Sequence, residues 1–190
     1  SEPAEKIYQK EEISGIQNAL FETYGIDVEK YLLISRESLP ALLNCFGSTQ
    51  LNLSEDIDLI VDGLRITLTK GLQLLDGERL FCWLRSQTPD STTEQCRFFS
   101  SFLALGINQH RSLLLSENSN KLFNDIVNLS NTNLIFSDYD SHKKAADFLG
   151  TISTEPAVSF VPEFTRNQDA TLTLSTQDRE KLCSLFDADS

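Results

Sequence analysis

The chain has 190 residues, 40% of them hydrophobic and 23% charged, which is typical of a globular protein that needs neither metals nor disulfides to build its core. Its formal net charge of −12 opposes binding to nucleic acid and to anionic membranes. Its longest apolar stretch, residues 98–107, falls short of the roughly 20 residues needed to span a bilayer. Residues 65–111 depart from the acidic average, with six Lys and Arg against four Asp and Glu, and would tolerate an anionic ligand.

The first half of the chain predicts three helices and three strands. A helix is expected over residues 4–24, where apolar residues form a stripe at helical spacing and Gly25 supplies a stop. It is followed by a strand over 31–35, a helix over 38–44, and strands over 50–53 and 65–68. Ser54 as a cap and Gly63 as a terminator add a short helix over 54–62.

The second half predicts mostly helices. Asp76-Gly77 indicates a turn that opens one helix, and others are expected over 91–106, 112–129 and 139–149, the last capped by Ser137 or Asp138. The order of predicted elements ends with strands over 158–162 and 170–174 and a helix ending near Phe186. This order predicts an α/β fold, a mixed β-sheet covered by helices in α-β-α layers. No linker interrupts it, so residues 1–190 are expected to form a single domain.

The segment richest in potential chemistry is Gly71-Leu-Gln-Leu-Leu-Asp-Gly-Glu-Arg-Leu-Phe-Cys-Trp-Leu-Arg-Ser-Gln87. Taken alone, it fits a purely structural strand-turn-helix corner, with Asp76 as the N-cap and Arg85 at the negative end of the helix dipole. A functional alternative pairs Arg85 with Arg97 of the next helix. Two guanidinium groups on adjoining antiparallel helices could hold one phosphate through paired, planar hydrogen bonds.

Several segments, in order, resemble the LytR-CpsA-Psr family of cell-wall glycopolymer transferases. Residues 71–87 are similar to the family pattern GxxxLDGEqALxYvRsR, and Arg97 falls on the second arginine of its RxxRQ helix. Tyr24-Gly-Ile-Asp-Val-Glu-Lys-Tyr-Leu-Leu-Ile-Ser35 resembles the fgIxvdyYvxvd segment, and Ile126-Val-Asn-Leu-Ser-Asn-Thr-Asn133 resembles vxTNLs. The similarity spans nearly the whole chain, although no single motif is decisive.

The resemblance implies a function at the cell envelope. It implies an extracytoplasmic domain, membrane-anchored by a segment outside these residues, that is connected with attaching polyprenyl-pyrophosphate-linked glycopolymer to the cell wall. It assigns phosphate binding to Arg85 and Arg97 and places a lipid pocket near Trp83, Phe98 and Phe102. The same aromatic residues, judged by spacing alone, are more typical of a hydrophobic core.

The chain departs from the family at three of these positions. Gln87 and Glu94 stand where the family has arginines, and Phe98 stands where it has glutamine. The family's Mg²⁺-binding aspartates belong to strands that would precede residue 1, so the domain is expected to be N-terminally incomplete relative to the family. No catalytic residue and no metal ligand are therefore assigned, and no cofactor is expected with certainty.

Three functions follow as alternatives. The first is a degenerate domain that binds a polyprenyl-phosphate lipid or a cell-wall glycopolymer without catalysing its transfer. The second is an active phosphotransferase whose catalytic piece lies outside these residues. The third is a non-catalytic scaffold with a protein partner in the envelope. None of them involves nucleic acid.

Overall fold

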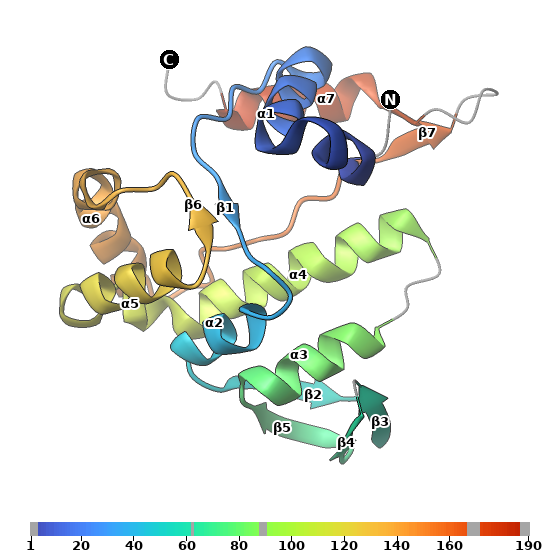
Figure 1. Cartoon of the computed structure of the whole chain (residues 1–190), viewed down its shortest axis with the longest axis vertical. Coiled ribbons are helices and arrows are strands. Elements are labelled where there is room, and N and C mark those ends of the chain that lie inside the picture. Colours follow the sequence, from blue (N-terminus) through green and yellow to red (C-terminus); the bar gives the residue numbers. More distant parts are fainter. Residues whose placement is uncertain (1–3, 62, 88–90, 167–171, 187–190) are drawn as a thin grey trace. The chain divides into compact units, whose positions relative to one another are not determined.

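The computed structural model describes residues 4–61, 63–87, 91–166 and 172–186 (Figure 1). Contacts divide the chain into two compact units, one made of Ser1–Tyr31 with Phe160–Ser190 and the other of Leu32–Ser159. We call them the terminal unit and the central unit. The expectation of one domain over residues 1–190 stays a prediction.

The terminal unit combines two helices with one strand pair. Its elements are α1 (Ala4–Tyr24), β7 (Phe164–Arg166), β8 (Leu172–Leu174) and α7 (Thr176–Phe186). The predicted span 4–24 is helical, but a kink at Glu12, with a φ of +55°, divides α1 into two helical parts. The last helix begins and ends as predicted. The strand predicted over 158–162 is wrong, because β7 begins two residues after Pro162, whose ring nitrogen has no hydrogen to donate to a ladder. The other predicted strand forms at Leu172–Leu174; residues 170 and 171 lie outside the described ranges.

The central unit contains the remaining described elements. In chain order they are β1 (Leu32–Leu33), α2 (Leu39–Cys45), β2 (Thr49–Leu53), β3 (Ile57–Val61), β4 (Leu64–Leu68), β5 (Gly71–Leu75), α3 (Gly77–Ser86), α4 (Thr92–His110), the 3₁₀ helix η1 (Arg111–Leu114), α5 (Ser116–Asn128), β6 (Asn131–Thr132) and α6 (Phe136–Thr151). The strands pair as β1–β6, β2–β5 and β3–β4.

The α/β class predicted from the sequence is confirmed. Every pairing among the described strands is antiparallel, including β7–β8 of the terminal unit. The helices therefore accompany several two-stranded sheets rather than one mixed sheet.

The helix predicted over 54–62 is wrong, because this segment is the first strand of a hairpin. Ile57, Leu59 and Val61 of β3 are half-buried while the residues between them are exposed, which is the period-two pattern of a strand. Gly63 has a φ of +84° and lies between β3 and β4, so it serves a hairpin turn rather than a helix end.

The helix predicted over 139–149 begins earlier than expected. Ile135 occupies the N-cap position of α6, and Asp138 lies in the first turn, where its carboxylate accepts a hydrogen bond from the Ile135 N–H at 2.9 Å. The predicted caps, Ser137 and Asp138, are therefore inside the helix. Asp138 caps the helix from its third position. In the sequence, an acid at this position is easily mistaken for the N-cap residue itself.

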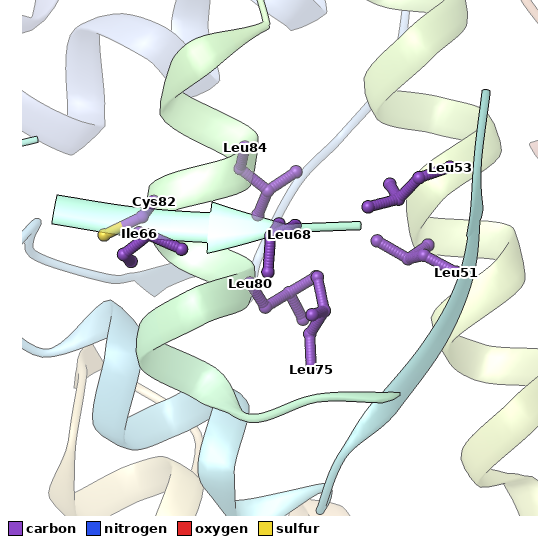
Figure 2. Close-up of a cluster of buried hydrophobic side chains, with 8 residues drawn as sticks. All are labelled: Leu51, Leu53, Ile66, Leu68, Leu75, Leu80, Cys82 and Leu84. Atoms are coloured by element: carbon purple, nitrogen blue, oxygen red, sulfur yellow. The ribbon is translucent and has the colours of Figure 1, made fainter. Parts of the chain in front are cut away.

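The core of the central unit lies between α3 and two strand pairs. It consists of eight buried residues from β2, β4, β5 and α3: Leu51, Leu53, Ile66, Leu68, Leu75, Leu80, Cys82 and Leu84 (Figure 2). Asp76 starts α3 by accepting a hydrogen bond from the Arg79 N–H at 2.9 Å, which confirms the predicted turn. This cap fixes the start of α3 and so directs Leu80 and Leu84 into the core.

Candidate ligand cavity

The two arginines predicted to bind phosphate lie on exposed parts of consecutive helices. Arg85 is in the last turn of α3, with its guanidinium carbon 5.8 Å from the centre of the Phe81 ring. Arg97 lies in the N-terminal part of α4 and is also exposed. Whether both guanidinium groups approach one anion stays a prediction.

The three aromatic residues predicted to form a lipid pocket do meet. The Trp83 ring of α3 lies 5.6 Å from the Phe98 ring and 6.0 Å from the Phe102 ring of α4, measured between ring centres. All three are half-buried and pack against the core. They join α3 to α4, and Phe102 also lines a cavity.

That cavity is apolar and has a volume of about 370 Å³. It lies among α2, β2, α3, α4, η1 and α5 of the central unit. Its walls are apolar except for Thr49, His110 and Arg111; the other lining residues are Leu43, Phe46, Leu80, Phe102, Leu103, Gly106, Ile107, Leu114 and Leu122. We call it the apolar cavity.

The lack of a side chain at Gly106 accounts for part of the volume of the apolar cavity. Gly106 was expected to end the helix, but α4 continues to His110 and carries the glycine within it. A Cβ atom built on Gly106 would meet no other atom within 4 Å. This glycine within a helix is thus the one local feature of the sequence that indicates the cavity.

The polar groups of the wall are held in place. The His110 Nε2 and Thr49 Oγ1 atoms are 3.2 Å apart, and the His110 ring lies 6.2 Å from the Phe46 ring. Burial lowers the pKa of His110 and so favours its neutral imidazole. Arg111 donates hydrogen bonds to the carbonyl oxygens of Asn108 at 2.9 Å and Ser153 at 3.4 Å.

The residues that stand at two arginine positions of the LytR-CpsA-Psr pattern are engaged in local structure. Gln87 turns its amide back onto α3, donating to the Trp83 carbonyl oxygen at 3.2 Å and to the Ser86 hydroxyl at 3.1 Å. Glu94 lies in the first turn of α4, where the helix dipole favours an acid. Neither residue adds positive charge beside Arg85 or Arg97.

The described residues contain neither a metal-binding cluster nor a membrane-spanning helix. Within the described ranges, no three His, Cys, Asp or Glu side chains gather as they would around a metal ion. Among these same residues, no helix is both long and apolar enough to cross a membrane.

No family model matches the chain, and no curated protein is significantly similar to it in sequence. Solved structures do match. A protein from Eubacterium siraeum named as a transcription regulator is 19% identical, with a TM-score of 0.78 over 95% of this chain and 72% of its own. TagV from B. subtilis is 15% identical, with a TM-score of 0.69 over 94% of this chain and 70% of its own.

TagT, solved with LI-WTA bound, is 13% identical and has a TM-score of 0.62 over 96% of this chain and 69% of its own. At these identities the likeness establishes the fold. It agrees with the ordered motifs found in the sequence, and the chain therefore has a LytR-CpsA-Psr-like fold.

Proposed function

We propose that this chain binds a polyprenyl-phosphate lipid of the kind that carries cell-wall glycopolymer, and that it binds this lipid without catalysing its transfer. The observation that carries the proposal is the apolar cavity. It occurs in a fold that, in TagT, is found with LI-WTA bound. A cell-envelope location and an anchor outside these residues belong to the same proposal.

The physical chemistry of the cavity suits an isoprenoid chain. A volume of about 370 Å³ falls within the range of small-molecule sites, and nine of the twelve lining residues have no polar side-chain group. Burying the chain there removes apolar surface from water at roughly 25 cal/mol per Å². The neutral state of His110 avoids placing an ionised imidazole against the hydrocarbon.

The phosphate is assigned to Arg85 and Arg97. Phe102 supports this arrangement because it belongs both to the cavity wall and to the aromatic cluster, whose members Trp83 and Phe98 lie within two residues of Arg85 and Arg97 in the sequence. Gln87 and Glu94 leave fewer cations than the family pattern provides for stabilising the charge that develops on a pyrophosphate, which favours binding over catalysis. The net charge of −12 opposes the DNA contact that the name of the Eubacterium siraeum protein suggests.

A calorimetric titration with farnesyl phosphate tests the proposal. The wild-type chain should bind it, and Gly106→Phe should weaken binding by about tenfold or more, which corresponds to about 1.4 kcal/mol, because the new ring fills the cavity. Gly106→Ala is the matched control: it adds one methyl group and should bind as the wild type does.

Two results would contradict the proposal. One is an unchanged affinity of Gly106→Phe for farnesyl phosphate, which would place the isoprenoid chain elsewhere. The other is equal affinity of the wild type for inorganic phosphate and farnesyl phosphate, since the isoprenoid chain would then contribute nothing to binding.

A further inference from the structure

Among the described residues that line the apolar cavity, only His110 has a side chain that gains or loses a proton near neutral pH. Arg111, the other ionisable residue of the wall, stays charged throughout this range. The lining residues Phe102, Gly106 and His110 follow one another along α4 at one-turn spacing. His110 is the last of this row and the farthest along α4 from Arg97, so it would meet the end of a bound chain that is remote from the phosphate.

Contacts with two other segments hold the imidazole of His110 at the cavity wall. Its Nε2 atom is 3.2 Å from the hydroxyl oxygen of Thr49, which exposes 4% of its surface at the start of β2. The Phe46 ring, at the end of α2, lies 6.2 Å from the imidazole ring, measured between ring centres. A neutral Nε2 can accept the Thr49 proton and a protonated one can donate to the Thr49 oxygen, so this contact is possible in both states.

The surroundings of His110 do not favour a positive charge. Arg111, the next residue, lines the same cavity and is itself positive. Glu155, an exposed carboxylate, lines a neighbouring space together with both of them. The described residues that α2, β2, β5, α3 and α5 contribute to these two spaces carry no ionisable side chain. Burial is the cause of the lowered pKa of His110.

A hydrocarbon chain in the cavity would make a charged imidazole more costly still, because the chain displaces the water that solvates the charge. Proton binding and chain binding therefore oppose each other, and the linkage between them fixes the sign of the pH effect. Affinity for the chain is highest above the pKa that His110 has in the free protein. Below that pKa it falls by about tenfold for each pH unit.

We propose that His110 is a proton switch of the apolar cavity, which admits an apolar chain when the imidazole is neutral and releases the chain when the imidazole is protonated. This inference rests on the proposed function, because it requires a chain in that cavity. It adds release in acid to that function, and it assigns the response to the hydrocarbon part of the ligand rather than to its phosphate.

Titrations with farnesol test the switch, because farnesol has the isoprenoid chain and no ionisable group. Farnesyl phosphate alone would not serve, since a phosphate monoester loses its second proton at about pH 6. The NMR signals of the imidazole first give the pKa of His110 in the free chain. One pH unit below that pKa, farnesol should bind about tenfold more weakly than at pH 7.5. Saturating farnesol should in turn lower the pKa of His110.

Two histidine variants separate the switch from a general effect of acid. His110→Gln removes the titrating group, so its affinity for farnesol should be the same at both pH values. His142→Gln is the matched control, because His142 is the other of the two histidines and is exposed on α6. It should keep the affinity and the full pH dependence of the wild type. The fluorescence of Trp83 shows whether each variant is folded at the lower pH.

The outcomes separate the switch from the proposed function. If the wild type binds farnesol equally well at both pH values, the switch is refuted while lipid binding stands. A His110 that takes up no proton as long as the chain is folded would also refute it, as would a pH dependence that persists in His110→Gln. If neither farnesol nor farnesyl phosphate binds at pH 7.5, the proposed function fails and the switch fails with it.

Discussion

Gly77→Ala should destabilise the central unit by about 3 kcal/mol. Gly77 is the first residue of α3, and a Cβ atom there would collide with the Pro40 carbonyl oxygen and lie 2.8 Å from the Asn44 backbone nitrogen. The new methyl group would also disturb the hydrogen bond from the Gly77 N–H to Asn44 Oδ1, now 2.7 Å long. Urea unfolding followed through the fluorescence of Trp83, the single tryptophan, measures the change.

Gly106→Ala makes the same substitution at a helical glycine with open space around it. It should stabilise the protein by about 0.5 to 1 kcal/mol, since alanine loses less conformational entropy in a helix. Opposite signs for the two variants would support the close approach of α3 to α2. A wild-type unfolding midpoint for Gly77→Ala would instead show that α3 does not approach the Pro40 carbonyl as closely as described.

Leu75→Ala should destabilise the central unit by about 3 to 4 kcal/mol. Leu75 exposes 1% of its surface and packs with Leu80 in the core shown in Figure 2. Truncation removes buried methyl groups and leaves a cavity that the surrounding strands and α3 can fill only in part. The same urea titration gives the difference in the free energy of unfolding.

Leu74→Ala is the control on the same strand. Leu74 is 64% exposed because successive residues of β5 point to opposite faces, so its truncation should change stability by no more than about 0.5 kcal/mol. Equal effects of the two variants would contradict the assignment of β5 faces.

The features of the fold that the sequence predicted correctly depend on local signals. Asp76 caps α3 as expected, and the apolar stripe over residues 4–24 forms α1. The errors arose where one signal has two structural meanings. A glycine after an apolar segment can either end a helix or form the turn of a hairpin. At Gly63, the pairing of β3 with β4 shows that it forms a hairpin turn.

The candidate site was predictable only in part. The resemblance to the family placed a lipid pocket near Trp83, Phe98 and Phe102, and the structure brings these three rings together. The apolar cavity depends on residues such as Leu43, Ile107 and Leu122, which come from different helices and share no local pattern. A cavity between elements that lie far apart in the sequence is not visible in the sequence periodicity. Gly106 is the one local feature that indicates it.

Methyl NMR during a titration with farnesyl phosphate shows whether the apolar cavity takes the isoprenoid chain. If it does, the methyl resonances of Leu43, Ile107 and Leu122, which line the cavity, should shift as the ligand is added. Those of Leu72 and Leu74, which are 66% and 64% exposed on β5, should stay in place. Unshifted cavity resonances at saturating ligand, or the same shifts with inorganic phosphate alone, would contradict the claim.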